Sequence, residues 1–161
     1  WQDGPGQAEG FYRRPEYQPE DIYRHGPRRI HDGAYAQKLF TTYATHNAGL
    51  MQQVNVMPGG RCTFCIWVQV WSSQYFDPES VTEPGNYRVW VGIDPYGGTD
   101  WRSPNIIWSP PHMEYNTWML LCVSAIARRD VVTVFTRGEP EFRVKHNDSY
   151  WDDASLVETA P

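Results

Sequence analysis

The sequence lacks both a hydrophobic run long enough to cross a membrane and an excess of positive charge. Its 161 residues carry 14 Lys and Arg against 19 Asp and Glu, which gives a net charge of −5. A membrane helix needs roughly 18 consecutive apolar residues, and no stretch approaches that length. A nucleic-acid backbone is bound by clustered Lys and Arg. We therefore expect neither a membrane span nor a nucleic-acid partner.

Motifs of the common enzyme classes are also missing. There is no Gly-x-Ser-x-Gly elbow of the serine hydrolases and no Gly-x-x-x-x-Gly-Lys phosphate loop. The five His show no metal-binding spacing. A glycoside hydrolase needs two carboxylates roughly 5 to 10 Å apart across a cleft, and no pair of acidic residues stands out from the Pro- and Gly-flanked loops. We expect a protein that is not an enzyme, with a glycoside hydrolase as the least favoured alternative.

Cysteine is scarce, with three residues in the chain. Cys62 and Cys65 form a Cys-x-x-Cys pattern, but within a strand this spacing points the two side chains to opposite faces. A zinc or redox site is therefore disfavoured, because both need the two sulfurs on one side. A pair between Cys65 and Cys122 requires their strands to be neighbours, so pairing and free thiols both stay open.

Aromatic and turn-forming residues are abundant. Eight Trp and ten Tyr stand beside 13 Gly and 13 Pro, which is typical of strands joined by many turns. No amphipathic helix stands out, and residues 1–30 show no period, so we expect a long ordered loop there. The pattern predicts one all-β domain over residues 1–161, a two-sheet antiparallel β-sandwich (jelly roll) of about eight strands. The segments that read as strands cover residues 34–42, 50–56, 61–71, 87–93, 118–127, 131–137 and 150–157.

The segment 61–71 carries large residues on both of its faces. One face reads as the inside of a sandwich: Cys62, Phe64, Ile66, Val68 and Val70. The other holds Trp67, Gln69 and Trp71, where a half-exposed strand is normally polar. The segment 87–93 repeats this with Arg88 and Trp90. A slip of one residue in register would exchange the two faces.

Aromatic rings beside amide and guanidinium groups suit sugars, whose C–H faces stack on rings while their hydroxyls take polar partners. The alternative is that a second layer or a loop of the same chain covers these tryptophans. The turn-rich loop that follows residue 93 adds further rings and an acidic side chain. The candidate ligand-binding residues are Trp67, Gln69, Trp71, Arg88, Trp90, Asp94, Tyr96, Trp101 and Trp108.

Four ordered motifs carry a resemblance to a known family. They are His31-Asp-Gly-Ala-Tyr-Ala-Gln-Lys-Leu39, Leu50-Met-Gln-Gln-Val-Asn-Val-Met-Pro-Gly59, Trp118-Met-Leu-Leu-Cys-Val123 and Tyr150-Trp-Asp-Asp-Ala-Ser-Leu156. Over residues 31–157 the chain resembles galactose-binding-domain-like jelly rolls, more narrowly the carbohydrate-binding modules of bacterial xylanases and glucanases. The resemblance implies non-catalytic binding of a polysaccharide or oligosaccharide by a secreted or cell-surface protein, as part of a larger multidomain chain.

The resemblance also implies a structural calcium ion. Relatives often hold it with the first Asp of the closing Asp-Asp pair and with oxygens near the early Gly turn, which here implies Asp152 and the turn at Asp32. The alternative is that Asp152 accepts backbone N–H bonds only. The family's first strand, of the type Asn-x-x-Phe-Glu, has no counterpart before Trp1. An extracellular structural or adhesion domain that contacts proteins is the alternative function, because Trp-rich faces also form protein interfaces.

Overall fold

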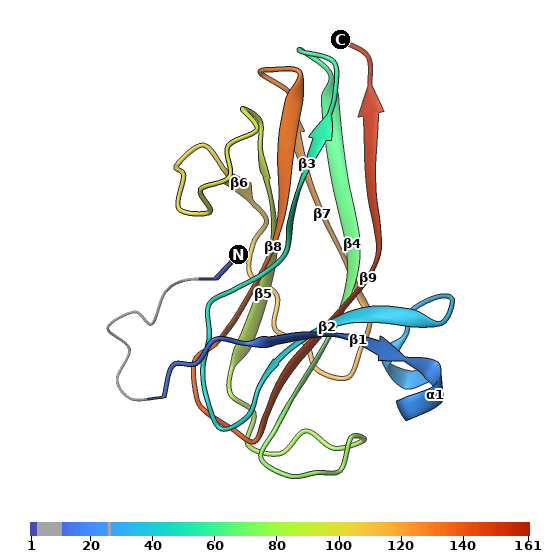
Figure 1. Cartoon of the computed structure of the whole chain (residues 1–161), viewed down its shortest axis with the longest axis vertical. Coiled ribbons are helices and arrows are strands. Elements are labelled where there is room, and N and C mark those ends of the chain that lie inside the picture. Colours follow the sequence, from blue (N-terminus) through green and yellow to red (C-terminus); the bar gives the residue numbers. More distant parts are fainter. Residues whose placement is uncertain (3–10, 26) are drawn as a thin grey trace.

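The computed structural model describes residues 1–2, 11–25 and 27–161, and these residues build two antiparallel sheets that face each other (Figure 1). The five-stranded sheet has the order β1 (Glu16–Asp21), β2 (Tyr35–Thr41), β9 (His146–Thr159), β4 (Arg61–Ser73) and β7 (Met119–Ile126). The four-stranded sheet has the order β3 (Met51–Asn55), β8 (Val131–Pro140), β5 (Tyr87–Asp94) and β6 (Ile107–Trp108). The predicted two-sheet antiparallel β-sandwich is confirmed.

The expectation of a loop over residues 1–30 is wrong between Glu16 and Arg29, and its part over residues 3–10 lies outside the described residues. Strand β1 pairs with β2 from Glu16 opposite Phe40 to Asp21 opposite Tyr35. It leads into the single-turn helix α1 (Ile22–His25) and the 3-10 turn η1 (Pro27–Arg29). The strand was hidden because Pro19 lies inside it and its residues do not alternate. Proline is tolerated in an edge strand, where one side of the backbone has no partner, and β1 lies at the edge of its sheet.

Alternating residues of the central strands meet between the sheets and form the hydrophobic core. The predicted register of β4 is confirmed, since its five inward residues all belong to this core. Consequently Trp67 and Trp90 lie on the outward faces of the two sheets, each only half-buried. The three strands that contribute most residues to this core are β4 with Cys62, Phe64, Ile66, Val68 and Val70, β5 with Tyr87, Val89, Val91 and Ile93, and β7 with Met119, Leu121, Val123 and Ala125.

A chain of hydrogen bonds around the buried His46 crosses the core from one sheet to the other. The His46 ring, 1 % exposed, lies 3.0 Å from Thr41 Oγ1 through Nδ1 and 2.7 Å from the Tyr87 hydroxyl through Nε2. The Tyr87 hydroxyl is 3.0 Å from Ser149 Oγ, which accepts a 3.0 Å bond from Trp151 Nε1. Buried polar groups cost free energy unless they are paired, and this network pairs the imidazole ring and the three hydroxyls.

Stability should fall as the pH drops below about 6.5. Burial lowers the pKa of His46 to about 3, whereas the unfolded chain keeps the ordinary value of about 6.5. Between these values the unfolded state binds the extra proton, so His46 makes the free energy of unfolding decrease by about 1.4 kcal/mol per pH unit on acidification. Urea unfolding between about pH 4 and pH 7 should give a steeper pH profile for the wild type than for His46→Gln. Parallel profiles would contradict this role.

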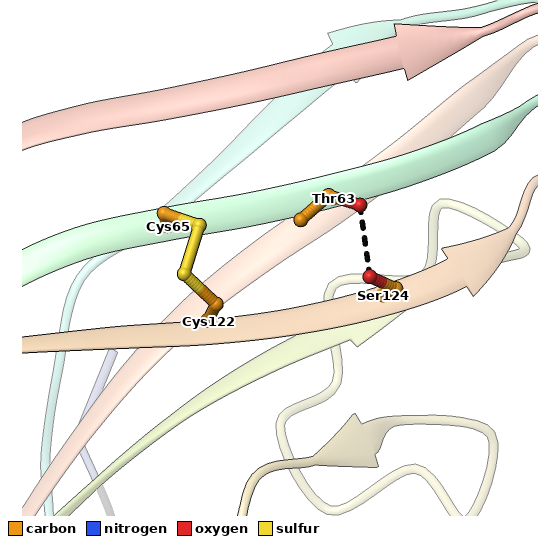
Figure 2. The surroundings of a disulfide bond; sticks show 4 residues. All are labelled: Thr63, Cys65, Cys122 and Ser124. Carbon is orange, nitrogen blue, oxygen red and sulfur yellow. Dashed lines mark hydrogen bonds between the residues drawn. A yellow bond between two sulfur atoms is a disulfide. The ribbon is translucent and has the colours of Figure 1, made fainter.

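A disulfide bond joins β4 to β7 on the outward side of the five-stranded sheet (Figure 2). Cys65 and Cys122 lie directly opposite each other in the register, with a Cα–Cα distance of 4.2 Å. Two residues along each strand, the hydroxyls of Thr63 and Ser124 are 2.8 Å apart (Figure 2). The pairing that the sequence left open is present, while Cys62 is buried in the core as a free thiol.

Removing this disulfide should destabilise the fold by about 3–4 kcal/mol, because the bridge closes a loop between residues 57 positions apart and restricts the unfolded chain. Urea unfolding with and without a reductant measures the effect. The double variant Cys65→Ser/Cys122→Ser should unfold at the same urea concentration as the reduced wild type and should not respond to reductant. Ser124→Ala, which removes only the neighbouring hydrogen bond, should shift the midpoint far less. An unchanged midpoint on reduction would refute the prediction.

Candidate functional site

On the outward face of the five-stranded sheet, Trp67 is covered by an imidazole. The His31 ring stacks on Trp67 with centroids 4.0 Å apart and an interplanar angle of 17°. The same imidazole meets Trp118 edge-on at 5.4 Å, and its Nδ1 lies 2.5 Å from Asp153 Oδ2. One face of the Trp67 indole is therefore already in contact with a side chain of this protein.

Further along the same face, Trp71 and Gln69 are buried, with exposed fractions of 7 % and 3 %. Trp71 stacks on His146 at 4.1 Å, and its Nε1 donates to the Ser80 carbonyl at 3.2 Å. Gln69 Oε1 accepts a 2.7 Å bond from Arg29, whose guanidinium lies 5.1 Å from the Trp71 ring. Trp71 and Gln69 are therefore covered by other parts of the same chain, which is the alternative considered from the sequence.

The four-stranded sheet carries a second aromatic group on its outward face. Trp90 and Arg137 are cross-strand partners, and the guanidinium of Arg137 lies 4.8 Å from the Trp90 ring and 5.5 Å from the Trp101 ring. Arg88 lies 6.0 Å from Trp90 on the same strand. Trp101 also stacks on Trp1 at 4.4 Å with an angle of 13°. The rings of this group are likewise in contact with side chains of the chain itself.

The predicted residues therefore do not form one site, because they are divided between two sheets. Trp67, Gln69 and Trp71 lie on one outward face, while Arg88, Trp90 and Trp101 gather on the other. Trp108 is half-buried in β6, where its ring would meet any side chain placed at Gly92, and it is tilted against Phe135 at 6.0 Å. The remaining two predicted residues, Asp94 and Tyr96, line a cavity in the loop after β5.

This cavity, which we call the loop pocket, has a volume of about 480 Å³. It lies at one end of the sandwich, between the long β5–β6 loop, drawn in yellow in Figure 1, and the turn that joins β7 to β8. Its wall combines two carboxylates, a guanidinium, an amide, two hydroxyl side chains and a phenol. The lining residues are Asp94, Tyr96, Gly98, Thr99, Asp100, Ser103, Pro104, Asn105 and Arg129.

Asp94 is the most buried polar group of the loop pocket, with an exposed fraction of 1 %. Its Oδ1 accepts a 2.8 Å bond from the Tyr96 N–H, an arrangement in which an Asp side chain fixes its own turn. Its Oδ2 has no hydrogen-bond partner among the described residues. A Cβ at Gly98 would lie 2.5 Å from this oxygen, so the glycine keeps Oδ2 uncovered.

Seven of the nine lining residues, Asn105 and Arg129 among them, were not among the predicted site residues. Arg129 belongs to a turn more than twenty residues after the loop, and in the sequence it reads as an ordinary polar turn residue. The two segments meet because Gly97 adopts a φ of +73°, where a Cβ would lie 2.4 Å from Val131. No pattern in the sequence reports such a contact between distant segments.

The predicted calcium site brings together the residues that the resemblance implied, but with the wrong donors for a cation. Asp152 Oδ2 accepts bonds from the N–H groups of His31 at 2.9 Å and Asp32 at 3.4 Å, and its Oδ1 accepts from the Asp153 N–H at 2.9 Å. Calcium takes six to eight oxygen ligands. The described residues hold no cluster of three or more His, Cys, Asp or Glu that could bind a metal. Asp152 thus accepts backbone N–H bonds, which is the alternative considered from the sequence, and the residues present do not fit Ca²⁺.

Replacing Asp152 should therefore cost stability without a calcium effect. We expect Asp152→Ala to lower the free energy of unfolding by about 1–2 kcal/mol, because three backbone N–H groups lose their acceptor. Thermal unfolding of the wild type should give the same midpoint in millimolar Ca²⁺ and in chelator. A midpoint that rises with Ca²⁺ in the wild type but not in Asp152→Ala would establish the calcium site instead.

Several solved structures are similar to this chain over most of its length. A family 61 carbohydrate-binding module, solved with β-1,4-galactotriose, matches with a TM-score of 0.59 and 13 % identity over 91 % of this chain and 88 % of that chain. A family 16 carbohydrate-binding module matches with a TM-score of 0.51 and 17 % identity over 92 % and 86 %. The enzymatically active domain of tailspike protein 4 from bacteriophage CBA120 matches with a TM-score of 0.59 and 8 % identity over 92 % of this chain but 18 % of that one.

The chain therefore has the β-sandwich fold of carbohydrate-binding modules. No protein-family model matches the sequence, and no curated protein does. Within the described part of the chain, no helix has the length and apolar character that crossing a bilayer requires.

Proposed function

We propose that this protein binds carbohydrate without chemically changing it, and that the loop pocket takes the sugar. The observation that carries the proposal is the buried Asp94, whose Oδ2 faces the loop pocket without a partner. Asp94 Oδ2 is not one of the buried polar atoms that lack a partner, so this acceptor is open to the loop pocket and can be reached by a donor there. A bound ligand with hydroxyl donors would supply the missing hydrogen bond. The fold shared with carbohydrate-binding modules agrees with this role.

The chemistry of the remaining wall suits a sugar ring. A hydroxyl that donates to Asp94 Oδ2 leaves neighbouring hydroxyls within the pocket, where the amide of Asn105 and the guanidinium of Arg129 can donate to them. Tyr96 is 43 % exposed, so its ring is accessible to the C–H face of a sugar. A volume of about 480 Å³ falls within the range of ligand pockets, roughly 300 to 1,000 Å³.

The outward sheet faces contribute less to this proposal than the loop pocket does. Trp71 and Gln69 are buried, and Trp67 and Trp101 each stack on another ring. Arg88 and Trp90 are half-buried, and they remain candidates for secondary contacts with a longer chain. A polysaccharide that reached both regions would bind through the loop pocket first.

A binding role fits the carboxylates better than hydrolysis does. Asp94 ends β5 and Asp100 lies in the loop that follows, and each uses an oxygen to hold this loop: Asp94 Oδ1 accepts from the Tyr96 N–H, and Asp100 Oδ1 accepts a 3.0 Å bond from the Arg102 N–H. A glycosidase instead places two carboxylates on either side of the bond that it breaks. Here the acidic groups shape the wall of the loop pocket.

We also propose that the protein acts outside the cytoplasm, where polysaccharides are encountered. The Cys65–Cys122 disulfide supports this location, because such bonds persist in oxidising compartments and are rare in the cytosol. The protein would act there either by itself or as one domain of a larger multidomain protein.

Affinity electrophoresis and calorimetry on soluble galactan, xylan, β-glucan and mannan test the function. We expect binding to at least one glycan and a loss of about tenfold or more in affinity for Asp94→Asn, because a hydrogen bond to a charged acceptor is removed. The asparagine still accepts the Tyr96 N–H bond, so the loop should keep its shape. Asp130→Asn is the matched control: it makes the same change of charge in the turn beside Arg129, outside the lining of the loop pocket.

Two results would overturn the proposal. If a folded protein binds none of the glycans, the sandwich serves another role, and contact with proteins becomes the leading alternative. If a glycan binds and Asp94→Asn behaves like Asp130→Asn, the sugar site lies elsewhere. In that case Trp90→Ala and Trp67→Ala would show which outward face holds it.

A further inference from the structure

We infer that the loop pocket selects neutral glycans and rejects those that carry uronic acids. This inference rests on the proposed function and narrows its ligand class. It follows from where the charges of the lining residues lie and from which hydrogen bonds each of them can form.

The lining is negative where it is deepest. It contains two carboxylates, Asp94 and Asp100, against the single guanidinium of Arg129. Asp94 is 1 % exposed, so water screens its charge poorly, whereas Arg129 is exposed and well screened. A uronate placed in the loop pocket would meet the less screened negative charge.

Hydrogen bonding acts in the same direction. The unpartnered Asp94 Oδ2 accepts hydrogen bonds and cannot donate them. A sugar hydroxyl has a proton to donate, but an ionised carboxylate of a uronic acid has only acceptors. Gly98 has no Cβ, and a Cβ there would lie 2.5 Å from Oδ2, so the glycine leaves this oxygen open to a ligand in the loop pocket. Two acceptors that face each other without a proton between them repel.

The basic cavity on the five-stranded sheet does not provide a second binding site for a uronate. This cavity of about 130 Å³ is lined by Arg28, Arg29, Lys38, Trp71, Pro78 and Tyr150. Its cations already have partners. Arg29 donates to Gln69, Asn116 and the Pro78 carbonyl, Lys38 lies 2.8 Å from Asp148 Oδ2, and Arg28 forms an ion pair with Glu79. Acidic glycans therefore gain no free cation there.

The test compares a neutral hexose polymer that binds, such as galactan, with the same polymer after its C6 hydroxyls are oxidised to carboxylates. We expect the oxidised polymer to bind at least about fivefold more weakly, since two like charges about 4 Å apart cost about 1 kcal/mol even in bulk water. Raising the salt concentration should narrow this difference, because salt screens the repulsion. Loss of a hydroxyl contact alone would not respond to salt.

Charge variants assign the effect to the loop pocket. Asp100→Asn should narrow the difference between the two polymers, because the lining becomes neutral while the Arg102 N–H keeps its acceptor. Asp130→Asn, the control outside the lining, should leave the difference unchanged. Circular dichroism and the urea midpoint establish that each variant is folded.

The outcomes separate the inference from the function on which it rests. Equal or tighter binding of the oxidised polymer overturns the preference for neutral glycans and leaves the sugar-binding function standing. Weaker binding that neither salt nor Asp100→Asn changes also overturns it, because charge is then not the cause. Absence of binding to every polymer, neutral and oxidised, overturns both.

Discussion

The pairing of β4 with β9 is the interaction on which the rest of the structure depends. The two strands lie together from Arg61 opposite Thr159 to Ser73 opposite His146, with a register shift between Cys65 and Trp67. Both neighbours of this pair, β2 and β7, attach to it. The inward side of β4 supplies much of the core, and its outward side sets the disulfide and the stacked tryptophan. A change in this register would move all of these features together.

The loop pocket depends on this core indirectly, through strand β5. β5 packs across the core from β4 and ends at Asp94, where the β5–β6 loop begins. Strand geometry holds the carboxylate, and two successive glycines let the loop fold back over it. The binding groups are thus carried by a loop, while their position is set by the sandwich. This division of labour is common in proteins, because irregular segments can vary without loss of the core.

Much of the fold could be predicted from the sequence, because alternation over a long strand has only two possible registers. In β4 the apolar set from Cys62 to Val70 is continuous and the opposite set carries Gln69, so the inward face was correctly chosen. β1 was missed because an edge strand needs neither alternation nor a free N–H at Pro19. Its existence depends on β2 beside it, which is a tertiary fact.

The candidate site was predictable only in part. Asp94 and Tyr96 were selected because an aromatic and an acidic residue share one turn-rich loop, and they do line a common cavity. The tryptophans were selected for their faces, but whether a ring is free depends on what packs on it. His31 on Trp67 and Arg137 on Trp90 come from distant segments, so no local pattern reports them. For the same reason Arg129 could not be identified beforehand as a neighbour of Asp94.

The disulfide makes the two edges of the five-stranded sheet unequal. β7 lies at one edge and is covalently tied to the central strand, whereas β1 at the other edge is held to β2 without a covalent link of this kind. Local opening costs least where a segment can leave its neighbours singly. Fraying should therefore begin at the β1 edge, and amide protons there should exchange with solvent sooner than those of β7. Local unfolding of the five-stranded sheet should thus proceed from the β1 edge, which has no disulfide to its neighbour, toward the β7 edge, which has one.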